Sequence, residues 1–394
     1  MLGRYATLQG GALESNDSSG LTLHCDYSQA LTLAQQGVSL LERYDKSGVL
    51  VELEEGFNAL RNVNEYLPPS HPAKATCLSS LGDTLQRRFD HLGDLADIGG
   101  AIAAKEQAIS HTPDGHLDKP MYLNNLGNSF LRRFEQLGYF ADLDEVINAK
   151  QQAVCLAPDD HPAKPTYLNS LGSSFLRRFD HSHDFADLNA AITAQQFVVR
   201  LTPDGHPHKA GRLTNLGNSL QNRFERLGNL TDLGEAIASK QQAVCLTPDG
   251  DPHKPMYLNN LGISFQSRFD CLGDLASLDE AITAMQQAVH LTPDGHPHKP
   301  GRLNNLGNSL QSRFERLGAI ADLDRVIIAQ QQAARLTPGD HPHRPVCLSN
   351  LGVSLQGRFD RLGHIADLEE AIMVQQEAIR LTPNSHPRKS MCFQ

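Results

Sequence analysis

The sequence predicts an all-α solenoid in which about eight helix-turn-helix hairpins follow one another with a period of 45 residues. Leu-Gly pairs recur at that interval, each interval holds two apolar stripes with helical spacing, and proline-rich segments separate the intervals. One hairpin cannot bury its apolar face alone, so the period indicates stacked units rather than separate globular domains. The glycines of the seven pairs are Gly82, Gly127, Gly172, Gly217, Gly262, Gly307 and Gly352.

The first helix of each unit is predicted from one apolar stripe, which is clearest between residues 301 and 317. Steps of three and four residues place its members on one face of a helix. Gly318 follows the stripe, and glycine ends helices well because it adopts the left-handed conformation without a side-chain penalty. The stripe consists of Leu303, Leu306, Leu310, Phe314 and Leu317.

The second helix of each unit is predicted from a second stripe, which runs in the same unit from Leu323 to Leu336 and ends at Thr337-Pro338. Its start is predicted from an acidic or hydroxyl residue followed three positions later by glutamate. That spacing is typical of a capping box, in which the two side chains bind each other's backbone N–H groups. The pairs are Asp142/Glu145, Asp232/Glu235, Ser277/Glu280 and Asp367/Glu370.

Glycine inside the first helix costs about 1 kcal/mol relative to alanine, so its recurrence predicts that the second helix approaches it closely. Small residues at matching positions of the second helix favour this interpretation. They are Ala101, Ala191, Ala236, Ala281 and Ala371, and further along Ala108, Ala153, Ala243, Ala288, Ala333 and Ala378.

An arginine precedes a phenylalanine near the end of every first helix. Its planar set of donors suits a carboxylate, so we expect it to tie the first helix to the acidic start of the second, as with Asp142 or Asp322. These arginines are Arg88, Arg133, Arg178, Arg223, Arg268, Arg313 and Arg358.

The repeat array is predicted to span residues 29–389. Residues 1–28 are small and polar, which is typical of a disordered segment. A degenerate first copy follows, in which Leu33, Gly37 and Tyr44 keep the phase of the later repeats. Residues 390–394 match the start of a further first helix, so we expect an incomplete repeat there, which leaves open both a complete chain and a fragment of a longer protein.

Composition excludes several classes of function. The net charge of −10 argues against a nucleic-acid partner. No 18-residue apolar run is present, so no membrane partner is expected, and seven cysteines without a C-x-x-C pair indicate a reducing, cytoplasmic setting. No nucleophile, phosphate-loop or metalloprotease motif occurs, so we expect no enzyme, no cofactor and no small-molecule substrate. The His-Pro-His triplets at 206–208, 296–298 and 341–343 predict solvated turns rather than a metal site.

One unit resembles the tetratricopeptide repeat (TPR), whose signature places W-x2-L-G-x2-Y before two alanines and a proline. The repeat is longer than the usual length of about 34 residues, which is similar to the kinesin-light-chain type. Copies such as LNNLGNSLQSRFERLG at 303–318 look like arrays found in fungal proteins ahead of a caspase-like CHAT protease domain. The matching residues of one copy are Leu123, Leu126, Gly127, Phe130, Val146, Ala153 and Pro158.

This resemblance implies a right-handed superhelix whose first helices line the concave face. An asparagine stands two residues before the glycine in five of seven copies, and three copies carry another just after it. An amide both donates and accepts, so a row of amides could hold the backbone of an extended peptide; in light-chain-type repeats an asparagine at the first position contacts bound peptide. The alternative is that these amides bond to a neighbouring helix or to water. The candidates are Asn125, Asn128, Asn215, Asn218, Asn260, Asn305, Asn308 and Asn350.

The sequence therefore predicts a non-enzymatic scaffold or adaptor whose concave face binds an extended peptide or a helix of a protein partner. The second hypothesis is a regulatory or sensor arm of a caspase-like CHAT protease system.

Overall fold

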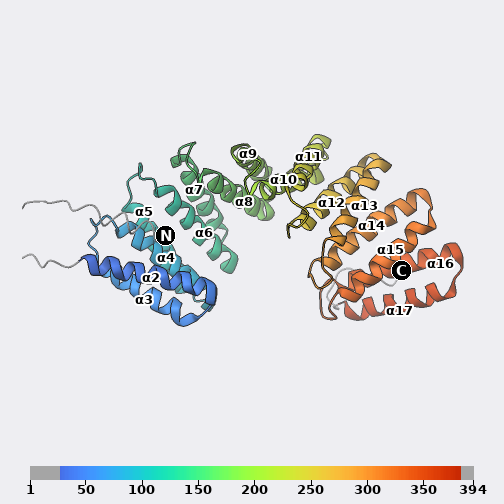
Figure 1. Cartoon of the computed structure of the whole chain (residues 1–394), viewed down its shortest axis with the longest axis horizontal. Coiled ribbons are helices and arrows are strands. Elements are labelled where there is room, and N and C mark those ends of the chain that lie inside the picture. The colour runs from blue at the N-terminus through green and yellow to red at the C-terminus, as the bar shows by residue number, and fades with distance from the viewer. Residues whose placement is uncertain (1–26, 383–394) are drawn as a thin grey trace, which may run out of the picture. The chain divides into compact units, whose positions relative to one another are not determined.

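The structure, a computed structural model, describes residues 27–382. Within that range it contains sixteen helices and no strand, and the helices pair into eight consecutive hairpins (Figure 1). The all-α fold and the 45-residue period are confirmed. Each helix packs most extensively on its hairpin partner, and within each compact unit the second helix of a hairpin packs next on the first helix of the following hairpin. Residues 1–26 of the predicted N-terminal segment and the predicted partial repeat at 390–394 lie outside the described residues.

The chain divides into two compact units between Leu201 and Thr202. The first unit contains four hairpins, which begin with α2, α4, α6 and α8. Its helices are α2 (Tyr27–Ser47), α3 (Leu50–Tyr66), α4 (Lys74–Leu92), α5 (Leu95–Ser110), α6 (Lys119–Leu137), α7 (Phe140–Leu156), α8 (Lys164–Ser182) and α9 (Phe185–Leu201).

The second unit also contains four hairpins, which begin with α10, α12, α14 and α16. Its helices are α10 (Lys209–Leu227), α11 (Leu230–Leu246), α12 (Lys254–Leu272), α13 (Leu275–His290), α14 (Lys299–Leu317), α15 (Ile320–Leu336), α16 (Arg344–Leu362) and α17 (Ile365–Leu381).

The ends of the first helices follow the glycine rule that the sequence predicts. α14 ends at Leu317, and Gly318 adopts φ 70° and donates its N–H to the carbonyl of Phe314. α8 is the exception, because His183 takes the left-handed conformation after it, with φ 56°. The second helices end shortly before a proline; α15, for example, ends at Leu336 before Thr337-Pro338, as predicted.

The capping-box prediction is wrong. α7, α11, α13 and α17 begin two residues before the predicted N-cap, so Asp142, Asp232, Ser277 and Asp367 lie within the first turn. Asn229 and Asp274 are the side chains that cap α11 and α13, by accepting N–H bonds two residues on. The predicted N-cap residues bind instead to arginines, as described below.

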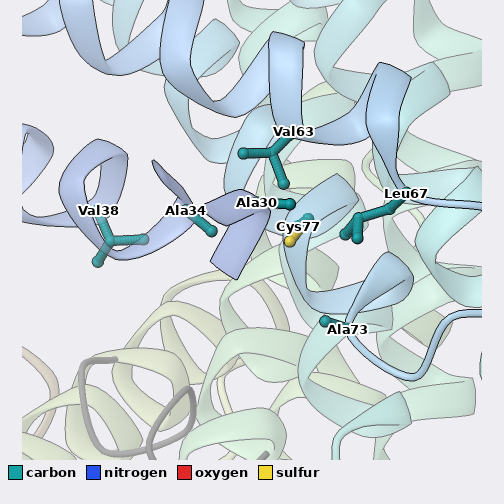
Figure 2. Close-up of a cluster of buried hydrophobic side chains, with 7 residues drawn as sticks. All are labelled: Ala30, Ala34, Val38, Val63, Leu67, Ala73 and Cys77. Carbon is teal, nitrogen blue, oxygen red and sulfur yellow. The ribbon is translucent and has the colours of Figure 1, made fainter. Parts of the chain in front are cut away.

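The degenerate first copy forms a hairpin, α2–α3, with its own apolar core. Gly37 lets the two helices approach, because a Cβ built there would lie 2.9 Å from Cγ of Leu60. A cluster of buried side chains joins α2 and α3 to the start of α4 (Figure 2). Its members are Ala30, Ala34, Val38, Val63, Leu67, Ala73 and Cys77.

Candidate functional site

The recurrent glycines mark a close approach between the two helices of each hairpin, as predicted. A Cβ built on Gly217 of α10 would lie 3.1 Å from the carbonyl oxygen of Ala236 on α11 and only 2.8 Å from Cγ of Lys240. The nearest group is therefore a long side chain that lies over the glycine. Its role was not predicted from the sequence, although a long side chain recurs at this position with the same period.

The side chains that cover these glycines occupy one position in each second helix. Six of the seven are no more than 3 % exposed, and three of them are lysines. Burial of an ammonium group is costly unless polar partners surround it. In chain order the residues are Lys105, Lys150, Gln195, Lys240, Met285, Gln330 and Gln375.

Lys240 connects two repeats through its ammonium group. Nζ donates to Oε1 of Gln221 on α10 at 2.6 Å and to Oγ of Ser264 on α12 at 2.8 Å. Burial lowers the pKa of Lys240 to about 8, and the nearby Glu225 opposes this shift. Lys105 differs, since it also forms an ion pair with Asp83 at 2.9 Å.

In repeats where another residue replaces the buried lysine, the glutamine of the first helix that would accept its hydrogen bond has no such donor. Gln266 and Gln311 correspond to Gln221, and the residues over the glycines in their repeats are Met285 and Gln330. Oε1 of Gln266 and Oε1 of Gln311 are both buried without a hydrogen-bond partner among the described residues. The lysine is thus a polar connector that only some repeats possess.

The arginine of each Arg-Phe pair binds the start of the second helix, as predicted. Arg223 donates from Nε and Nη2 to the two carboxylate oxygens of Asp232, at 2.8 and 2.6 Å, and Asp232 is buried. Arg268 donates to Oγ of Ser277 because its repeat has no carboxylate at that position. These seven arginines hold the hairpins together. Their partners are Asp97, Asp142, Asp187, Asp232, Ser277, Asp322 and Asp367.

The eight predicted asparagines lie on the first helices and differ in exposure. Asn215, Asn218 and Asn308 are exposed, whereas Asn125, Asn128, Asn260, Asn305 and Asn350 are half-buried.

Two of these amides bond to the preceding first helix. Nδ2 of Asn305 donates to Oδ1 of Asn259 at 3.1 Å, and Nδ2 of Asn350 donates to Oδ1 of Asn304 at 2.7 Å. At these positions the amide row connects adjacent repeats, which is the arrangement of the alternative hypothesis. Each amide commits one of its two donor hydrogens to that bond.

Three of the predicted asparagines line pockets in the second unit. A pocket of about 300 Å³ between α10 and α12 is lined by Asn218, Asn260, Gln221, Glu225 and the buried Lys240.

A larger pocket, of about 1140 Å³, lies along the N-terminal parts of α12, α14 and α16, and Asn260 and Asn305 line it. We call it the α14 pocket. It is bounded by the two turns that precede α14 and α16.

Two of the three His-Pro-His triplets, at 296–298 and 341–343, lie in the turns at the edge of the α14 pocket. In each turn the first imidazole accepts the backbone N–H of the second histidine through Nδ1, for example His296 from His298 at 3.1 Å. The rings of His341 and His343 lie 5.4 Å apart and line the same pocket. Across residues 27–382, no group of three or more histidine, cysteine or acidic side chains is arranged to hold a metal ion.

None of the described helices has the length and apolar character needed to cross a bilayer. No family model matches the sequence, and no curated protein matches it either.

Solved structures are similar to this chain. The C-terminal part of a TPR repeat-containing protein from Cytophaga hutchinsonii superposes with a TM-score of 0.53 and 12 % identity, covering 79 % of this chain and 99 % of that one. A structure from Podospora anserina, described as putative kinesin light chain nearly identical TPR-like repeats, gives a TM-score of 0.41 and 17 % identity, covering 56 % and 99 %. The first of these likenesses shows the fold: the chain is a TPR-like array of helical repeats.

Proposed function

We propose that this chain is a non-enzymatic scaffold whose first helices bind an extended peptide or a helix of a partner protein. Helical-repeat arrays are generally used as platforms for protein–protein interaction. The observation that carries the proposal is that Asn260 and Asn305, two amides predicted from the sequence, line one open pocket that spans three consecutive first helices. A site that extends over several repeats suits an elongated ligand better than a compact one.

The chemistry of this surface fits a peptide backbone. Exposed amides such as Asn215 and Asn308 can donate to a carbonyl oxygen and accept from an N–H of the same ligand. The bonds from Asn305 and Asn350 to the preceding helix fix the orientation of their amides, which lowers the entropic cost of binding. Met256 and Val346 add exposed apolar surface at the α14 pocket for the side chains of the ligand.

Selection from a displayed library of random peptides tests the proposal. The triple variant Asn215→Ala, Asn260→Ala and Asn305→Ala removes three amides, each of which contributes about 0.5–1.5 kcal/mol as a hydrogen-bonding group. We expect peptides selected by the unmodified chain to bind the variant at least roughly tenfold more weakly, with helicity by circular dichroism unchanged.

A matched control removes amides from the second helices. The exposed Gln241, Gln287 and Gln376, changed together to alanine, are expected to leave peptide affinity unchanged. Equal affinities for the unmodified chain and the asparagine variant would show that the amide row connects repeats and takes no part in binding.

A further inference from the structure

Two small residues line the α14 pocket at a place where a tyrosine fills the corresponding junction between α10 and α12. In other repeats a tyrosine stands near the start of the first helix and reaches back toward the preceding one. Tyr122 OH lies 3.1 Å from Oγ1 of Thr76, and Tyr257 OH lies 3.5 Å from the point where a Cβ on Gly211 would be.

In α16 the tyrosine position is occupied by Cys347, which lines the α14 pocket. The residue of α14 that corresponds to Gly211 is Gly301, and a Cβ built there would meet nothing within 4 Å. The same hairpin-to-hairpin junction is therefore filled between α10 and α12 and vacant between α14 and α16. Replacement of one tyrosine by cysteine is the sequence difference that accounts for the vacancy.

A buried cation lies in the wall of this pocket. Arg302 is only 7 % exposed, and its Nη1 donates to the hydroxyl of Thr292. It forms no ion pair with any residue in the described range, in contrast to the seven arginines that bind the second helices. Burial lowers its pKa, and no carboxylate offsets the effect.

The remaining charges at the pocket do not neutralise Arg302. Asp294 lines the pocket but pairs with Nζ of Lys299 at 3.3 Å, and Arg335 adds a second guanidinium. The pocket is therefore positive although the chain as a whole carries a net charge of −10. Charge complementarity of this kind favours an anionic ligand.

We propose that the α14 pocket is an anion subsite, in which Arg302 pairs with a carboxylate or phosphate group on a side chain of the bound peptide. This inference rests on the proposed peptide-binding function and adds the chemistry that selects the peptide. The guanidinium offers donors in a planar fork that matches both oxyanions. Because Arg302 is only 7 % exposed and has no carboxylate partner among the described residues, the ligand brings the missing countercharge.

Titration calorimetry of the full chain with inorganic phosphate and with acetate, at low ionic strength, tests the subsite without a peptide. We expect saturable binding of at least one anion, and the tighter one identifies the group that the pocket prefers. Arg302→Gln is expected to weaken this binding about tenfold or more. Arg212→Gln is the matched control, because Arg212 has the same position in α10 and donates to the corresponding threonine, but Tyr257 occupies the adjacent space.

Cys347→Tyr is a second variant that leaves Arg302 in place and fills the vacancy as Tyr257 does one junction earlier. We expect it to remove anion binding while the unfolding temperature stays the same or rises. If neither anion binds, or if both Arg302→Gln and Cys347→Tyr bind as the unmodified chain does, the subsite does not exist.

Peptide selection separates this result from a failure of the proposed function. The unmodified chain is expected to select peptides enriched in aspartate and glutamate, and the Arg302→Gln chain peptides without that enrichment. Selection of neutral peptides by both chains would overturn the subsite and retain the scaffold. Anion binding without any selected peptide would retain the subsite and overturn the scaffold.

Discussion

Lys240 connects its repeat to the next through hydrogen bonds to Gln221 and Ser264, and it does so at the cost of burying an amine. Its stem covers Gly217, so the residue combines an apolar packing role with a polar connecting role. Met285 fills the same place in the next repeat, where it keeps the packing role and its sulfur accepts a single weak hydrogen bond from Ser309 Oγ at 3.4 Å. Lys240 and Met285 are thus two natural alternatives at the same position of the repeat.

The lowered pKa of Lys240 makes stability depend on pH. In the unfolded chain this amine titrates near 10.5, and in the folded chain at about 8. Between those values the unfolded state binds more protons, so the stability contributed by the neutral amine is full above pH 10.5 and is lost as the pH falls through 8.

Lys240→Met is expected to remove this dependence. The free energy of unfolding of the unmodified chain, minus that of the variant, should increase by roughly 2 kcal/mol from pH 7.5 to 10, measured by urea unfolding. Lys105→Met is the contrasting variant, and it should destabilise the protein because it breaks the ion pair with Asp83. A difference for Lys240→Met that stays constant with pH would contradict the expectation.

At the scale of the helix pair, the glycine and the residue that covers it set the distance between the helices. The approach is not equally tight in every hairpin. A Cβ on Gly217 would lie 2.8 Å from the nearest side-chain atom of α11. A Cβ on Gly172 would lie 3.4 Å from the nearest side-chain atom of α9. The small residue of the second helix does not explain this difference in distance, because both hairpins have alanine at that position, Ala236 and Ala191.

Gly217→Ala is expected to lower stability by about 1–3 kcal/mol, because the added methyl group overlaps the stem of Lys240 and the carbonyl oxygen of Ala236. Gly234→Ala in α11 is the control. Nothing lies within 4 Å of a Cβ there, so the higher helix propensity of alanine should raise stability by about 0.5–1 kcal/mol. Thermal unfolding of both variants checks that their stabilities change in opposite directions. A Gly217→Ala variant more stable than the unmodified chain would show that the helices can move apart freely.

At the scale of the molecule, the hairpins within each compact unit pack against their immediate neighbours along the chain. Within the second unit the core consists of successive clusters, each shared by two adjacent hairpins, rather than one continuous core. Stability in such an array is close to a sum of local terms, so damage to one repeat remains local.

Leu355→Ala tests this local character. Leu355 is fully buried in a cluster to which α14, α15, α16 and α17 all contribute, and its truncation is expected to cost about 2–4 kcal/mol. Hydrogen exchange should accelerate in α16 and α17 and remain unchanged in α10 and α11. Met373→Ala, at an exposed position of α17, should change neither the stability nor the hydrogen exchange of these helices. Equal acceleration throughout residues 202–382 would show that the second unit unfolds as one cooperative body.

The candidate site could be predicted only in part. The asparagines could be predicted because they recur at a fixed distance from the glycine. The arginine–carboxylate bonds could be predicted because opposite charges recur at a fixed spacing in the two helices of each hairpin. Arg302 was not predicted as a binding residue. Its proposed role depends on the lack of a tyrosine at the matching position of α16 and on the lack of a carboxylate partner among the described residues, and neither can be recognised from Arg302 itself. The capping boxes failed because their aspartates serve arginines on the other helix, a contact that local spacing does not express.

The sequence by itself determined the architecture, because a period of 45 residues, two helical stripes and helix-ending glycines each follow from interactions between near neighbours in the chain. Only the tertiary structure decided which amides bond to one another, where an ammonium group is buried, and which junction between hairpins stays open. Those outcomes depend on side chains that meet from different repeats, about 46 residues apart for Asn259 and Asn305, where volume and charge must be balanced in space.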